Sequence, residues 1–170
     1  MFELSLSDIS RILKEYGISE HAAAFDELQR YNYDEKGSAS KEVRLIIKVR
    51  FDGRPPVVMR FRNETDVTEE LVEAQCRFAF LLLENGIESP YLYSSGGAFA
   101  RTYPINGYEV IVTAEDFCEG EVKAVDEATA RMTGRLLAEM HNISERKKVP
   151  SAARSVKANS AQPNRTAAIT

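Results

Sequence analysis

Two side chains of opposite charge, Arg60 and Glu73, could act together on an anion. Arg60 lies in a short alternating run, residues 57–62, that predicts a strand, and its side chain would project from the face opposite Met59. Glu73 falls near the start of the second turn of the helix that we expect next. A long cation held by a carboxylate is a common way to fix positive charge over phosphate oxygens. The alternative is a surface ion pair that contributes about 0–1 kcal/mol to stability.

The helix that carries Glu73 has recognisable ends. Asp66 and Glu69 stand in capping-box spacing, which predicts its start. Apolar positions recur at helical spacing through Glu84, and Asn85-Gly86 then predicts its end. The helix should therefore lie against the strand that carries Arg60.

Strand and hairpin signals precede this unit. Residues 43–49 alternate as in a half-buried strand, and Asp52-Gly53 predicts a hairpin into the Val57 strand. A further strand is expected from about Leu28, after a short helical turn that starts near Ser19. These segments predict a three-stranded antiparallel meander.

More strands follow the helix. Residues 91–93 and 98–103 predict short strands, and Asn106-Gly107 predicts a hairpin into a strand over 108–113 that is covered on both faces. Residues 114–121 then form an acidic connector that contains Gly120.

Two helices flank the predicted sheet. The first covers residues 5–16, with Ser5 as its cap and Gly17 at its end. The second covers about 124–142 and has one apolar face, and Gly134 within it predicts a close backbone contact. The residues of that face are Val125, Ala128, Met132, Leu136, Leu137 and Met140.

Composition limits the classes of function. The chain has 170 residues, enough for one domain with a sizeable core, and its net charge of −4 argues against a broad basic surface for nucleic acid. Cys76 and Cys118 lie in apolar patterns and are expected to be buried thiols of a reducing compartment. No export signal or membrane-spanning run is visible, so we expect a cytoplasmic protein without a membrane partner.

The last segment, residues 145–170, differs from the rest. It holds six cations, many Ala and Ser residues and no aromatic residue, and no apolar period continues through it. Such a segment buries too little surface to offset its ordering entropy, so we expect a disordered tail. A basic binding arm is the alternative.

Four phrases, taken in order, resemble a known family. VVMRF, LVEAQCRFAFLLLENGIESP, VIVTAEDFCEGE and MTGRLLAEMHNIS are similar to segments of the aminoglycoside phosphotransferase family, which includes choline, homoserine and methylthioribose kinases. The resemblance covers residues 25–144 and implies an α+β fold: a protein-kinase-like small N-terminal lobe with about five mostly antiparallel strands and a Glu-bearing helix. It divides the chain into an N-terminal helical segment (1–24), the small lobe (25–121), a helix leading to a large lobe (122–144) and the tail (145–170).

The resemblance also implies roles for individual residues. Arg60 would contact the phosphates of ATP bound with Mg²⁺, and Glu73 would orient Arg60. The connector residues Asp116, Phe117 and Cys118 would act as a hinge, with the backbone of Asp116 and Cys118 bonding the adenine edge. Gly37 and Ser38 occupy the place of the Gly-rich loop that covers the phosphates. The phosphate acceptor would be a hydroxyl of a small molecule.

The sequence departs from the family pattern in two places. The loop around Gly37 lacks the G-x-G-x-x-G pattern, and no Asp follows Asp126, so no catalytic base or metal ligand of the large lobe is matched. We therefore assign no catalytic and no metal-binding residue and expect a truncated small lobe that is inactive alone. Two alternatives remain: a non-catalytic protein-interaction module, and a small α+β binding domain whose resemblance to kinases is coincidental.

Overall fold

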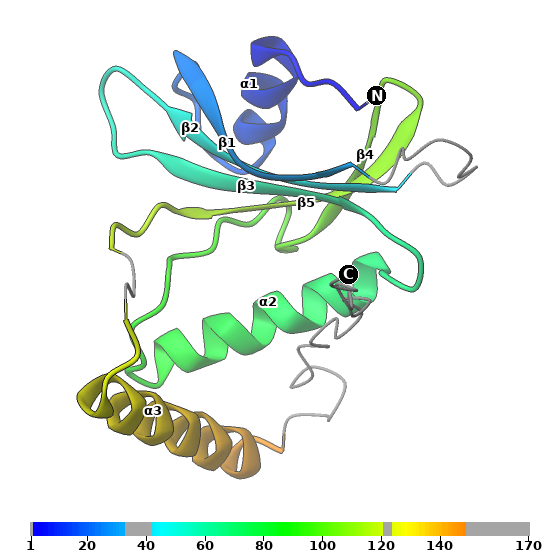
Figure 1. Cartoon of the computed structure of the whole chain (residues 1–170). Coiled ribbons are helices and arrows are strands. Elements are labelled where there is room, and N and C mark those ends of the chain that lie inside the picture. Colours follow the sequence, from blue (N-terminus) through cyan, green and yellow to red (C-terminus); the bar gives the residue numbers. More distant parts are fainter. Residues whose placement is uncertain (1, 33–41, 121–123, 149–170) are drawn as a thin grey trace, which may run out of the picture.

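The computed structural model describes residues 2–32, 42–120 and 124–148. Within these residues, five antiparallel strands form one sheet in the order β1-β2-β3-β5-β4, with three helices around it. Helix α1 covers one face of the sheet, α2 lies against the other, and α3 lies beyond α2 (Figure 1). The α+β class and the five-stranded antiparallel sheet are confirmed. The elements are α1 Leu6–Glu15, β1 Ala24–Asn32, β2 Val43–Arg50, β3 Val57–Asn63, α2 Glu69–Glu84, β4 Arg101–Ile105, β5 Tyr108–Asp116 and α3 Glu127–Arg146.

Helix α1 forms where the sequence predicts it. The Ser5 hydroxyl accepts a hydrogen bond from the Asp8 backbone N–H, and the Asp8 carboxylate accepts one from the Ser5 N–H, which completes a capping box. The Ser5 hydroxyl also donates to the Asp8 carboxylate, and this bond, aided by the one from the Ser5 N–H, holds the pKa of Asp8 below its ordinary value. The apolar side of the helix, Ile9, Ile12 and Leu13, is buried against the sheet.

The helical turn expected near Ser19 does not form. Strand β1 instead begins at Ala24, whose partner on β2 is Arg50. The alanines there have high helix propensity, but a few tenths of a kcal/mol per residue do not outweigh the ladder of hydrogen bonds that β2 offers. A register shift between Glu27 and Gln29 leaves Leu28 exposed.

The main core lies between α1 and the sheet. Alternate residues of β2 and β3, such as Leu45, Ile47, Met59 and Phe61, are fully buried there. The half-buried strand expected over 43–49 and the paired strand over 57–62 are both confirmed. Because successive side chains of a strand point to opposite faces, the intervening residues point towards α2.

Helix α2 ends as expected but begins differently. Thr68, not Asp66, is its N-cap, because the Thr68 hydroxyl accepts a hydrogen bond from the Leu71 N–H. Asp66 lies in the preceding turn with a φ of 66°. Asn85 caps the C-terminus and Gly86 follows with a φ of 86°, a left-handed conformation that glycine adopts easily.

The segment between α2 and β5 is less regular than the two short strands predicted over residues 91–93 and 98–103. Residues 91–93 form no strand, although Leu92 makes a single bridge to Glu115. Strand β4 begins at Arg101 rather than at residue 98. Asn106 and Gly107 have φ angles of 50° and 78°, as in the tight hairpin turn that this dipeptide favours. Strand β5 continues to residue 116, and its middle residues are buried on both faces, as predicted.

Helix α3 leaves its apolar face largely uncovered. Val125, just before the helix, is 79% exposed, and Met132 and Leu137 are 67% and 51% exposed. Only the C-terminal part packs on α2, where Ile143 meets Leu82. The helix begins at residue 127 and continues to residue 146, so it extends past the predicted end at 142 into the segment expected to be disordered.

The close contact expected at Gly134 is absent. A Cβ placed there would meet no atom of the described residues within 4 Å. None of the described helices is long and apolar enough to span a membrane.

Candidate functional site

Cationic side chains gather on the sheet face that points towards α2. Arg62 on β3 lies directly opposite Arg44 on β2, and Arg60 lies two residues away on the same face of β3. The Cys76 thiol of α2 is near enough to Arg62 and Arg60 for their charges to lower its pKa. Burial of the thiol outweighs them and raises that pKa to about 11.

Arg60 does not pair with Glu73, so the predicted ion pair is wrong. Its guanidinium instead binds Glu115 on β5, with Nη2 and Nε at 2.5 and 3.0 Å from Oε1. The side chains of Arg60 and Glu115 are 32% and 17% exposed, so the pair is partly buried. It lies on the inner face of the sheet, which is the face that points towards α2. The register explains the choice, because Glu115 is paired with Val58, one diagonal step from Arg60.

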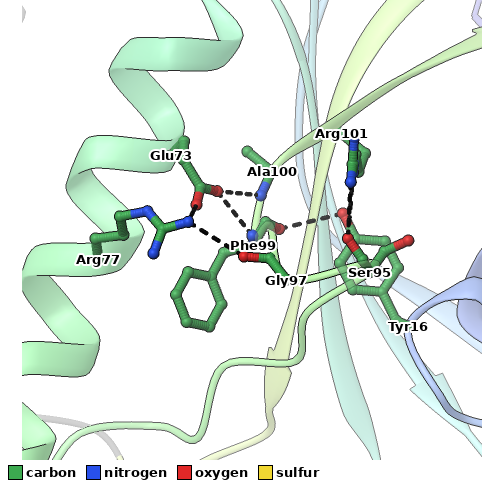
Figure 2. A network of polar contacts seen from close by, with 8 residues as sticks. All are labelled: Tyr16, Glu73, Arg77, Ser95, Gly97, Phe99, Ala100 and Arg101. Atoms are coloured by element: carbon green, nitrogen blue, oxygen red, sulfur yellow. Dashed lines mark hydrogen bonds and ion pairs between the residues drawn. The ribbon is translucent and has the colours of Figure 1, made fainter.

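Glu73 anchors the loop that leads into β4. Its Oε2 accepts hydrogen bonds from the backbone N–H groups of Phe99 and Ala100, at 2.7 and 2.8 Å (Figure 2). Its Oε1 lies 2.7 Å from Nη2 of Arg77 but makes no hydrogen bond there. Arg77 in turn donates to the Gly97 carbonyl at 3.1 Å. Glu73 is therefore occupied by structural contacts that hold α2 against the loop.

Tyr16 connects the same loop to the opposite side of the sheet. Its buried hydroxyl donates to the Val112 carbonyl at 2.8 Å and also lies 3.1 Å from the Phe99 carbonyl (Figure 2). Burial raises the pKa of this phenol, which keeps it protonated and able to donate. Arg101 donates to the Ser95 carbonyl within the loop. The sequence places Tyr16 only at the end of the helix predicted over residues 5–16 and gives no signal of this role.

Replacing Glu73 by Ala is expected to lower the free energy of unfolding by about 1.5–3 kcal/mol, the usual worth of hydrogen bonds to a charged group. Urea denaturation of the two proteins measures the difference. Glu84→Ala on the last turn of the same helix is the matched control, because Glu84 is exposed and sits at the unfavourable end of the helix dipole. Equal effects of the two substitutions would show that the Glu73 carboxylate does not hold the loop.

The connector after β5 is only partly available to a ligand. The Asp116 N–H donates to the Tyr91 carbonyl at 2.9 Å, and the Phe117 N–H donates to the Pro56 carbonyl at 3.1 Å. Among the described residues, the Cys118 N–H has no hydrogen-bond partner. Of the two backbone positions expected to meet adenine, Cys118 therefore keeps its donor available, whereas the N–H of Asp116 is used within the fold.

Side chains of the connector contact the sheet. Nζ of Lys48 on β2 lies 3.7 Å from the centroid of the Phe117 ring. The Tyr93 hydroxyl donates to Asp116 Oδ1 at 2.6 Å. Because Lys48 belongs to the alternate residues that point towards α2, Phe117 lies under the same sheet face as Arg60. Aromatic rings of this kind are common stacking partners for bases.

The two cysteines differ, contrary to the expectation that both are buried. Cys76 is 9% exposed and belongs to the smaller core under α2. Cys118 is exposed, because it follows β5 in a loop that no described element covers. Gly37 and Ser38, expected to lie over the phosphates, are outside the described residues.

The rest of the described surface offers no metal centre. Within the described ranges, no group of three or more His, Cys, Asp and Glu side chains could hold a metal ion.

A hollow of about 460 Å³ lies between the end of α2 and α3, where Asn85, Ile87 and Asn142 are among its lining residues. None of the predicted site residues lines it, so the Arg60 face is a surface distinct from this hollow.

Comparisons of the chain with protein-family models, with curated proteins and with solved structures found no match, so no family is assigned.

Proposed function

We propose that this chain is the ATP-binding small lobe of a phosphotransferase that acts on a hydroxyl of a small molecule. The position of Arg60 relative to the connector carries the proposal. Glu115, which holds the guanidinium, directly precedes Asp116, so Arg60 lies beside the connector that would act as the hinge. The resemblance to the aminoglycoside phosphotransferase family implies the same two parts in the same order along the chain.

The connector itself supports the proposal. The Cys118 N–H is an unused donor, within the described part of the chain, of the kind that an adenine edge needs. The Phe117 ring lies against Lys48, whose partner on β3 is Val58, a buried apolar residue on the same face as Arg60. A planar base would therefore find an aromatic ring and a backbone donor close to the guanidinium.

Helix α2 adds no support, because Glu73 binds the backbone N–H groups of Phe99 and Ala100 and does not bind Arg60. In kinases, a Glu of the corresponding helix pairs with the strand cation. The proposal therefore rests on Arg60 and the connector.

The exposed apolar face of α3 favours a second candidate function. Met132, Leu136 and Leu137 are 67%, 41% and 51% exposed on one helix, which is unusual for a surface helix without a partner. A non-catalytic interaction module would use this face to bind another protein. The two functions differ in whether nucleotide binds at the inner face of the sheet.

Alkylation of Cys118 tests the nucleotide site. ATP at millimolar concentration is expected to slow the reaction of Cys118 with iodoacetamide, because the bound base would cover the connector. Peptide mass spectrometry gives the rate at each cysteine separately. Cys76 is the internal control, since its burial and its raised pKa of about 11 make it slow to react with or without nucleotide.

Two substitutions distinguish the contribution of the phosphates to nucleotide binding from the contribution of the base. Arg60→Ala should raise the ATP concentration needed for protection about tenfold, the loss expected for one charge-assisted contact, and should leave protection by adenosine unchanged. Arg50→Ala removes an exposed cation that pairs with Asp26 elsewhere on the sheet, and should change neither. A Cys118 rate that no nucleotide alters would count against the proposal and favour the interaction module.

A further inference from the structure

Two arginines face each other across the β2–β3 pair. Arg44 and Arg62 are direct partners in the antiparallel register, so their side chains leave the same face of the sheet side by side. Arg60 is two residues from Arg62 on that face. Like charges placed directly opposite each other destabilise a sheet, so this arrangement has a cost in stability.

Arg62 is the least compensated of the three. Within the part of the chain that the structure describes, its guanidinium forms no ion pair and no hydrogen bond. Its side chain is half-buried between the sheet and α2. Burial, followed by the charges of Arg60 and Arg44, lowers the pKa of Arg62, although Glu64 opposes this effect. A guanidinium in such surroundings is stabilised by an anion.

The neighbouring carboxylates leave a positive charge unmatched. Glu115 is bound to Arg60, and Glu64 lies 3.9 Å from Nη1 of Arg44. Three guanidinium groups therefore share two carboxylates among the described residues. The remaining charge sits at Arg62, beside Arg44, whose guanidinium also lies 5.0 Å from the centroid of the Tyr31 ring.

We propose that Arg62 and Arg44 form a binding site for a phosphoryl group. A guanidinium offers planar pairs of N–H donors that match phosphate oxygens, and two guanidiniums side by side can bind different oxygens of one group. A doubly charged phosphate also replaces the repulsion between the two side chains with attraction. The site goes beyond the proposed function, because Arg60 and the connector are not needed for it.

Two sources could supply the phosphoryl group. One is free inorganic phosphate, and the other is the phosphate chain of a nucleotide held at Arg60, two residues away on β3. Both present the same chemistry to Arg62. Titrations with inorganic phosphate, ATP and adenosine distinguish them.

The test is a titration of the full chain with inorganic phosphate at constant ionic strength, followed by calorimetry and by thermal unfolding. Phosphate is expected to bind and to raise the unfolding temperature. Arg62→Gln should weaken binding about tenfold or more, the loss expected when charge-assisted hydrogen bonds to an anion are removed. In phosphate-free buffer the same variant should be at least as stable as the parent, because one of the repelling charges is gone, so a failure to fold would not be confused with a loss of binding.

Arg131→Gln is the matched control. It removes the same charge from a side chain that is 79% exposed on α3, and it should leave phosphate binding unchanged. The proposal would be overturned if phosphate failed to bind the parent, or if Arg62→Gln and Arg131→Gln lost equal phosphate affinity. If ATP displaces phosphate and adenosine does not, the nucleotide phosphates use the same site; if ATP leaves phosphate bound, the site is separate. Protection of Cys118 by adenosine does not involve Arg62, so it tests the proposed function independently.

Discussion

Given Mg²⁺, ATP and a panel of aminoglycosides, choline, homoserine and methylthioribose, the 170-residue chain is expected to form no phosphorylated product. Phosphoryl transfer requires in-line positioning, metal ions that bridge the phosphates and a residue that orients the acceptor hydroxyl. Under the proposed function, Arg60 and the Cys118 backbone would provide only the first contacts to nucleotide. The sequence has no Asp after Asp126, and no described cluster of side chains suits a metal.

Separation of the acceptors after incubation with radiolabelled ATP measures this directly. Product formation that Arg60→Ala abolishes would show that the residues of this chain suffice for transfer. ATP hydrolysis that persists unchanged in Arg60→Ala would instead indicate a contaminating enzyme. The substitution thus distinguishes activity of this chain from activity of an enzyme that co-purifies with it.

Phe61→Ala is expected to lower the free energy of unfolding by about 3–5 kcal/mol. Phe61 is fully buried on the central strand β3, and its ring centroid lies 6.0 Å from that of Phe2. Removing the ring leaves a cavity between α1 and the sheet that the neighbouring strands cannot close. Since the total free energy of unfolding of a small domain is about 5–15 kcal/mol, the variant should be close to unfolding at room temperature.

Urea denaturation again provides the measurement, with Leu137→Ala as the control. Leu137 is also a large apolar residue in a regular element, but it is 51% exposed on α3, so its loss should cost less than about 0.5 kcal/mol. A similar cost for both substitutions would mean that the apolar face of α3 is covered in solution. That outcome would also favour the interaction module.

Helix α3 shows how periodicity and burial differ. Helical spacing correctly indicates a helix with Met132 and Leu136 on one side, because that spacing depends only on the pitch of a helix. It does not say whether anything covers that side. The structure leaves those residues exposed, since only the end of α3 near Ile143 reaches α2.

Local patterns in the sequence determine most of the elements. Several elements can be predicted because each depends on neighbours a few residues apart: the strands over 43–49 and 57–62, the Asn106-Gly107 turn and the end of α2, which Asn85 caps. Alternation over 57–62 places Arg60 and Arg62 on one face of their strand. It does not bring Arg44 opposite Arg62, because that pairing depends on the register between two strands.

The tertiary structure decides which partners those cations have. Arg60 binds Glu115 because β3 pairs with β5, although α2 and β4 lie between these two strands in the chain. No spacing within the sequence indicates this pairing. The carboxylate that local reasoning assigns to Arg60, Glu73, is closer to it in the chain but is held elsewhere in the fold.

Glu73 is occupied by contacts that the helical pattern cannot reveal. The backbone N–H groups of Phe99 and Ala100 reach its carboxylate only because the loop before β4 folds back against α2. Sequence patterns report the period of an element and the face on which a residue lies. Strand order, register and loop position join residues that are distant in the chain, and they decide which charges meet, because a charge pairs with whichever partner the fold brings within a few ångströms.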